Sequence, residues 1–196
     1  LQEAEVERTR AELSLLKAQV NPHFFFNTLN SLYALSLDRS ERVPEVILKL
    51  SALMRYVLEG SNREETALED ELSFIEDYVE LEKLRISGNP DIRVEKKGDL
   101  SGKLIAPMIL VPFVENGFKH GINTMVGDGY LLIRLKVEEG NLEFVVKNSR
   151  TAGKPDSTGM GLKNVKRRLE LLYPGSHDLS IHERDDWFEI GLRIKP

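Results

Sequence analysis

The first twenty residues carry hydrophobic side chains at a spacing that suits a helix. Val6, Leu13 and Val20 recur every seven residues, which fits a short coiled coil as well as a plain amphipathic helix. Pro22 follows directly, and a proline removes a backbone donor and crowds the preceding turn. We therefore expect a helical lead-in over residues 1–20 that is perturbed at Pro22.

Helical spacing resumes after this proline and predicts a hairpin of two helices. Phe25, Leu29 and Leu32 form an apolar face at positions i, i+4 and i+7. A charged turn is expected over residues 37–45, and the second helical pattern ends at Gly60. A connection this short places the two helices side by side and antiparallel.

Beyond residue 63 the pattern switches repeatedly between helical spacing and strict alternation. Two strand pairs turn at Glu139-Gly140 and at Asp185-Asp186, which suit hairpin loops. Antiparallel strands mixed with helices predict an α+β layer with the helices on one sheet face. The expected helices cover residues 66–87, 106–121 and 162–173, and the expected strands cover 91–98, 129–138, 141–149 and two segments after residue 177.

Composition excludes several classes of protein. The chain has 196 residues, 41% of them hydrophobic, which is enough to build a core, and its net charge of −5 gives no general footprint for nucleic acid. Cysteine is absent, so disulfides, thiolate catalysis and thiolate zinc sites are excluded. No apolar run approaches the ~20 residues that span a bilayer. The chain starts at Leu1 inside a helical pattern, so we expect further segments upstream.

A single histidine stands beside three phenylalanines in the string NPHFFFN. Helical phasing places His23 on a stripe with Asn27 and Asn30, at i, i+4 and i+7, and not on the phenylalanine face. A lone histidine is more often packed or solvated than catalytic, but an imidazole on a polar stripe can act as a nucleophile toward phosphorus. Metal binding is the competing interpretation, and the other three histidines offer no ligand spacing to it.

The string VENGFKHG concentrates polar residues on an otherwise apolar helix. Glu115 and Lys119 are four residues apart, as are Asn116 and His120, so all four fall on one side. An amide oxygen suits Mg²⁺ and a lysine suits phosphate. The alternative is an exposed helix face whose final Lys-His pair complements the helix dipole.

The string STGMGLKN places two glycines just before a predicted helix. Gly159 and Gly161 would let backbone amides approach an anion at the positive helix end. A plain loop leading into a helix is the other interpretation, because a lone GxG is a weak signal.

Together these three strings resemble a known family, the LytS-like sensor histidine kinases. LKAQVNPHFFFNTLNSL is similar to their phosphoacceptor region, whose usual string is NPHFLFN. APMILVPFVENGFKHG is similar to their N box, and GMGLKNVKRRLELLYPG to the glycine box after the ATP lid. The resemblance covers nearly all of residues 13–196 and implies a GHKL-type ATP-binding domain with a mixed, largely antiparallel sheet. It further implies that residues 1–62 hold the lead-in and a helical hairpin that dimerises as a four-helix bundle, and that residues 63–196 hold the ATP-binding domain.

The same resemblance implies roles for individual residues. His23 matches the phosphorylated histidine. Asn116 matches the asparagine that ligates Mg²⁺, and Glu115 the acidic residue beside it. Lys119 and His120 match positions near the phosphates of ATP. These are positioning and charge-offsetting roles, as phosphoryl transfer requires.

The glycine box and the adenine site are matched less evenly. Gly159 and Gly161 match the glycines that let the lid fold over the phosphates. Asn148 stands where the family commonly has an adenine-reading Asp, and the following glycine is missing, with Gly153 as a possible substitute. Phe24 follows the histidine where many histidine kinases place an acidic base, which leaves Glu115 as the acidic candidate within a motif.

The resemblance therefore implies an ATP-dependent protein-histidine kinase core of a two-component system. It would autophosphorylate on His23 and pass the phosphoryl group to the receiver domain of a response regulator, acting as a homodimer without nucleic acid. We expect the fragment to be soluble and the full-length protein to hold it on the cytoplasmic side of the cell membrane, with membrane contact only through upstream segments. The alternative is a catalytically degenerate dimeric nucleotide-binding signalling scaffold, which the Asn148 departure and the short lid between Asn148 and Gly159 favour.

Overall fold

The computed structural model describes residues 22–60, 63–125, 128–150 and 160–195. The predicted lead-in over 1–20, Gly153 and Gly159 lie outside this range. The chain forms two compact units. The helical unit comprises the described residues up to Thr66 together with Asp70–Arg85 and Ile105–Met108, and the sheet unit comprises Ala67–Glu69, Ile86–Leu104 and the described residues from Ile109 onward.

The helical unit contains the predicted hairpin. Helix α2 (Pro22–Leu37) turns into α3 (Val43–Gly60), and the turn is closed by a hydrogen bond from the Ser40 amide to the Leu35 carbonyl at 2.9 Å. Helix α4 (Leu68–Lys83) belongs to the same unit from Asp70 onward. No helix in the described parts of the chain is both long and apolar enough to cross a membrane.

The buried face of α2 differs from the predicted one. Phe24 is 2% exposed and Thr28 is fully buried, whereas Leu29 is 49% exposed. The cause is that Phe24 stacks against Tyr78 of α4, with ring centroids 4.4 Å apart. The face that contains Leu29 is therefore left open on the surface.

The sheet unit has five strands in the order β2-β4-β5-β7-β6. Strand β2 (Asp91–Lys97) pairs parallel with β4 (Tyr130–Glu138), and β5 (Asn141–Ser149), β7 (Trp187–Ile194) and β6 (His177–Glu183) follow antiparallel. This confirms the predicted α+β fold with a mixed, largely antiparallel sheet. The β4–β5 loop turns at Glu139 and Gly140, which have φ of 50° and 81°, the positive values that a two-residue hairpin of this type requires.

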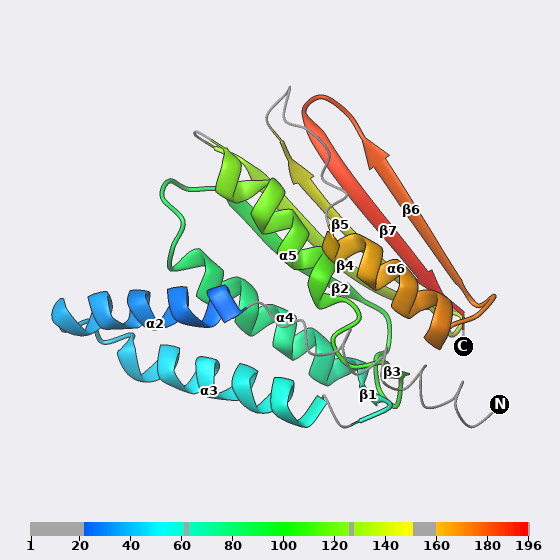
Figure 1. Cartoon of the computed structure of the whole chain (residues 1–196), viewed down its shortest axis with the longest axis horizontal. Coiled ribbons are helices and arrows are strands. Elements are labelled where there is room, and N and C mark those ends of the chain that lie inside the picture. Colours follow the sequence, from blue (N-terminus) through cyan, green and yellow to red (C-terminus); the bar gives the residue numbers. More distant parts are fainter. Residues whose placement is uncertain (1–21, 61–62, 126–127, 151–159, 196) are drawn as a thin grey trace. The chain divides into compact units, whose positions relative to one another are not determined.

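One face of this sheet is covered by helices α5 (Val111–His120) and α6 (Met160–Leu172) (Figure 1). Alternate strand residues point into this layer and are buried, because successive side chains of a strand face opposite sides. Phe144 of β5 meets Phe113 of α5 with centroids 6.3 Å apart. The opposite sheet face carries charged pairs such as Arg134 with Glu95 at 2.9 Å.

Helix α5 begins five residues later than the sequence pattern predicts. Strand β3 (Leu104–Ile105) pairs with the two-residue strand β1 (Thr66–Ala67), and the chain then turns through Met108, which has φ of 57°. Pro112 lies in the first turn of α5, where a missing amide donor costs nothing. The buried apolar run before Val111 is thus a turn and not helix.

Candidate functional site

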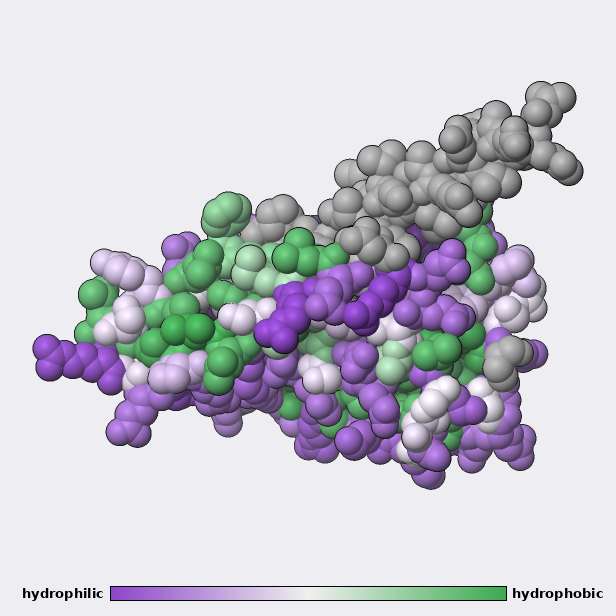
Figure 2. Space-filling view, turned by 90° about the horizontal axis from the view of Figure 1, so that it is seen from below, coloured by the Kyte–Doolittle hydropathy of each residue, from purple (hydrophilic) through white to green (hydrophobic). Residues whose placement is uncertain are grey.

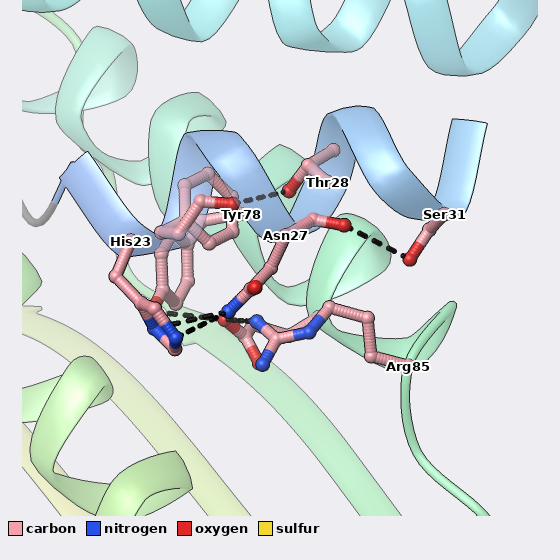
Figure 3. A network of polar contacts seen from close by, with 8 residues as sticks. His23, Asn27, Thr28, Ser31, Tyr78 and Arg85 are labelled. Carbon is pink, nitrogen blue, oxygen red and sulfur yellow. Dashed lines mark hydrogen bonds and ion pairs between the residues drawn. The ribbon is translucent and has the colours of Figure 1, made fainter. Parts of the chain in front are cut away.

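His23 lies in the first turn of α2 and is exposed. The amide nitrogen of Asn27, one turn later, lies 3.0 Å from Nδ1 and 3.1 Å from Nε2 of the imidazole (Figure 3). An amide nitrogen is a donor, so it bonds to a ring nitrogen that carries no proton. The predicted polar stripe of His23 and Asn27 is therefore present, and it holds the imidazole by its neighbour on the same helix.

The end of α2 that carries His23 is fixed on α4 by its next residue. Phe24 stacks on Tyr78 at an interplanar angle of 27°, and the Thr28 hydroxyl donates to the Phe24 carbonyl at 2.9 Å. Phe24 thus performs an anchoring role where an acidic residue stands in many histidine kinases. The imidazole is left at the surface while the adjacent backbone is held rigidly.

A charged pair, Glu82 of α4 and Arg85 just after the helix, lies in the same polar network. Glu82 is only 3% exposed, and its carboxylate accepts from Arg85 Nη1 at 3.0 Å and from the Tyr78 hydroxyl at 3.4 Å. Figure 3 shows the guanidinium of Arg85 pointing toward the same space as the His23 imidazole and the Asn27 amide. Sequence reasoning missed this pair, although Glu82 occupies a position on the apolar stripe of α4, where a charge is unexpected.

In the sheet unit, α5 carries the predicted polar group. Asn116 is 8% exposed, Glu115 and His120 are half-buried, and Lys119 is exposed. Burial, and then the charge of Lys119, lowers the pKa of His120. An imidazole whose protonated form is disfavoured and a lysine therefore stand together in the last turn of α5.

Asn148 lies at the end of strand β5, on the side of the sheet that α5 covers. It is 1% exposed, and its Nδ2 donates to the Ser149 carbonyl at 2.9 Å. Its Oδ1 is buried and accepts no hydrogen bond from any residue in the part of the chain that the structure describes. A buried acceptor of this kind is costly unless something donates to it.

Gly117 of α5 and Gly121, which directly follows the helix, let this segment approach the asparagine. A Cβ on Gly121 would lie 2.5 Å from Asn148 Nδ2, and one on Gly117 would lie 2.7 Å from a methyl of Leu131 and 3.8 Å from Asn148 Oδ1. Both positions exclude any larger side chain unless the neighbours move. Sequence reasoning missed their role, and their four-residue spacing on the sheet-facing side of a helix was the available signal.

Gly161 lies in the first turn of α6 and is exposed, and no atom of the described residues lies within 4 Å of the place a Cβ would occupy. Asn148 and the last turns of α5 are thus brought together in the sheet unit. His23 belongs to the helical unit. No group of three or more His, Cys, Asp or Glu side chains that could hold a metal ion occurs among the described residues.

Comparison with known proteins agrees with this geometry. Residues 11–89 match the sequence model of the histidine kinase family. The chain is 30% identical over 189 residues to the sensor histidine kinase BtsS of Escherichia coli strain K12, covering 95% of this chain and 34% of BtsS. It is 31% identical over 198 residues to the sensor protein LytS of Staphylococcus saprophyticus, covering 94% of this chain and 34% of LytS. The predicted resemblance to LytS-like sensor histidine kinases is confirmed.

The chain spans about a third of the length of these curated relatives. Among solved structures, the catalytic domain of histidine kinase ThkA superposes with a TM-score of 0.51 at 14% identity, covering 67% of this chain and 93% of that domain. A bacterial phosphotransferase superposes with a TM-score of 0.50 at 13% identity, covering 93% of this chain and 96% of that protein. At these identities the two structures establish the fold, which is that of histidine kinase catalytic domains.

Proposed function

We propose that this chain is the ATP-dependent kinase core of a sensor histidine kinase, autophosphorylated on His23. The observation that carries the proposal is the exposed imidazole of His23 in the segment that matches the histidine kinase family. An accessible imidazole with an unprotonated ring nitrogen is a competent nucleophile toward phosphorus. The phosphoryl group would then pass to an aspartate of a response regulator, as in the sensor kinases that the chain resembles.

The sheet unit supplies residues that fit ATP. The Oδ1 of Asn148 is a buried acceptor without a donor among the described residues, and the exocyclic amine of adenine is a donor that would satisfy it. An amide can therefore replace the more common Asp in this role. The end of α5 lies beside Asn148. This helix carries the half-buried Glu115 and His120 and the exposed Lys119, and the lysine can offset phosphate charge.

Asn116 is the residue that would hold Mg²⁺. Magnesium is commonly bound through one or two protein oxygens plus the phosphates of its nucleotide, so no cluster of carboxylates is needed. Gly161, where no described residue would meet a Cβ within 4 Å, would let an anion approach the N-terminal amides of α6. ATP would supply the phosphoryl group, and the chain positions it and offsets its charge.

We further propose that the core works as a homodimer. The α2–α3 hairpin leaves large apolar side chains on its surface, and green side chains gather over these helices in Figure 2. Phe26 is 67% exposed, Tyr33 66% and Leu48 71%. An apolar surface of this kind is typical of an interface, and a second hairpin would complete a four-helix bundle.

The alternative of a degenerate scaffold is not favoured. It rested on the Asn148 departure and on the short lid between Asn148 and Gly159. The buried acceptor of Asn148 is compatible with adenine, and the chain is similar to sensor histidine kinases over most of its length. We place the kinase core on the cytoplasmic side of the membrane, where its nucleotide and response regulator are available.

Incubation with γ-labelled ATP and Mg²⁺ tests the kinase proposal. We expect acid-labile, alkali-stable label on the wild-type chain and none on His23→Ala. His182→Ala, which removes an exposed histidine on β6, serves as the matched control and should label normally. Label that persists in His23→Ala would refute the assignment. Loss of nucleotide binding in Asn116→Ala, measured by calorimetry, tests the ATP site separately.

A further inference from the structure

The imidazole of His23 must lose a proton when it is phosphorylated, and the residue after it offers no base. A lone pair of one ring nitrogen forms the new N–P bond, while the bond from phosphorus to the leaving group breaks and its electron pair goes with that group. The ring then carries a positive charge, which it loses by releasing the proton on its other nitrogen. A nearby acceptor for this proton accelerates the step.

Glu82 is a buried carboxylate of the helical unit that is linked to the His23 end of α2 through Tyr78. It is only 3% exposed, and the Arg85 guanidinium at 3.0 Å offsets the cost of burying its charge. The Tyr78 hydroxyl, at 3.4 Å, holds the same oxygen. Because Phe24 stacks on the Tyr78 ring, this carboxylate is tied to the turn of α2 that carries His23.

Figure 3 shows the same arrangement from the side of α2. The imidazole of His23, the amide of Asn27 and the guanidinium of Arg85 point toward one another, and the hydroxyl end of Tyr78 lies in this view beside His23. The Glu82 and Arg85 side chains, at 4% and 25% exposed, are more buried than an ordinary ion pair on a helix surface. The exposed pair of Glu80 and Lys83, at 2.9 Å on the same helix and at the same spacing, illustrates that ordinary case.

We propose that Glu82, held by Arg85 and Tyr78, takes up the proton that His23 releases on phosphorylation. Glu82 becomes a neutral carboxylic acid as the phosphoryl group is added, so Arg85 is left to face the new phosphoryl charge. Arg85 thereby exchanges the carboxylate of Glu82 for the phosphoryl group as its negative partner. This inference rests on the proposed phosphorylation of His23 but not on the identity of the phosphoryl donor.

Phosphoramidate, a small donor that needs no nucleotide site, tests the inference apart from the kinase reaction. Phosphohistidine at His23 is followed as the gain in intact-protein mass that is absent from His23→Ala, on the wild type, Glu82→Gln and the control Glu80→Gln. General-base contributions are typically 10²- to 10⁴-fold, so we expect Glu82→Gln to be slower by about 100-fold and Glu80→Gln to match the wild type. Thermal melting is measured alongside, and if Glu82→Gln does not fold, the double variant Glu82→Gln/Arg85→Met, which removes both charges, replaces it.

Chemical rescue distinguishes a proton acceptor from a packing residue. Glu82→Ala leaves space for formate. Added formate should raise the phosphorylation rate of Glu82→Ala at least about tenfold and should not change the rate of Glu80→Ala. A folded variant without Glu82 that reacts at the wild-type rate, or a defect that formate does not relieve, overturns the proposal. Labelling with ATP is run in parallel: absence of label on the wild type would refute the kinase function, while a Glu82-dependent reaction with phosphoramidate would still support the role of Glu82.

Discussion

The buried carboxylate of Glu71 provides the sharpest test of how the helical unit is held together. Glu71 is fully buried on α4. Its Oε2 accepts from the Tyr56 hydroxyl on α3 and from the Met108 backbone amide at 2.8 Å. One oxygen therefore joins the hairpin, α4 and the turn that precedes α5.

Tyr56→Phe removes one of these donors and little else. The ring of Tyr56 packs on Phe74 with centroids 4.9 Å apart, and phenylalanine keeps this contact. A hydrogen bond to a charged group contributes roughly 1.5–3 kcal/mol, so we expect urea denaturation to show a loss of about 2 kcal/mol in the free energy of unfolding. Tyr33→Phe is the control, because Tyr33 is 66% exposed and its change should stay within about 0.5 kcal/mol.

The pKa of Tyr56 predicts how the stability difference between the wild type and Tyr56→Phe depends on pH. Burial, and then the charge of Glu71, raises the pKa of Tyr56 far above its ordinary value of 10.0. Near and above pH 10.0 the unfolded chain loses the phenolic proton of Tyr56 while the native chain keeps it. The wild type therefore loses stability as the pH rises. Tyr56→Phe lacks this loss, and the gap between the two proteins should narrow between about pH 8 and about pH 10.5. Equal stabilities of the two proteins at about pH 8 would refute the role of this hydroxyl.

Three further outcomes follow from the structure. Gly121→Ala places a Cβ 2.5 Å from Asn148 Nδ2. We therefore expect it to lose about 1–3 kcal/mol in the free energy of unfolding and to bind nucleotide more weakly in calorimetry. In the control Gly161→Ala the new Cβ meets no atom of the described residues within 4 Å, so this variant should melt at or above the wild-type temperature. Phe26→Glu, at a side chain 67% exposed, should shift sedimentation from dimer to monomer without lowering helix content in circular dichroism. Because burial lowers the pKa of His120, the unfolded chain binds a proton that the native chain resists, so stability falls as the pH drops through the ordinary value of 6.5; His120→Gln should show a shallower fall in chemical denaturation.

Much of the fold was predictable because each element has its own local period. Alternation gave the strands, and Glu139-Gly140 gave the tightest hairpin, since both residues adopt positive φ. The start of α5 was not predictable in this way. A continuous buried run such as residues 105–110 fits a helix or a turn equally well by hydrophobicity, and the turn at Met108 depends on its amide reaching Glu71.

The candidate site divides along the same line. The polar stripes of α2 and α5 are properties of one helix, so spacing placed His23 and Asn116 on them, while the resemblance to LytS-like kinases implied their roles. Glu82 contributes through Tyr78 and through the packing of α4 against α2, and Gly121 contributes through its closeness to Asn148. Such contacts join segments far apart in sequence, and no local period reports them.

The direction of each residue in the NPHFFFN string follows from the helix itself. With about 100° per residue, Phe24 and Thr28 face α4, and Phe26 and Tyr33 face the open surface, at 67% and 66% exposed. The stripe that carries His23 falls between these two apolar faces. Within the helical unit α2 packs against α3 and, through Phe24, against Tyr78 of α4, and the proposed second copy would cover the face of Phe26 and Tyr33. Because the stripe lies between the two contacts, dimerisation can bury Phe26 and Tyr33 without burying the imidazole of His23. A phosphoryl donor must reach this imidazole.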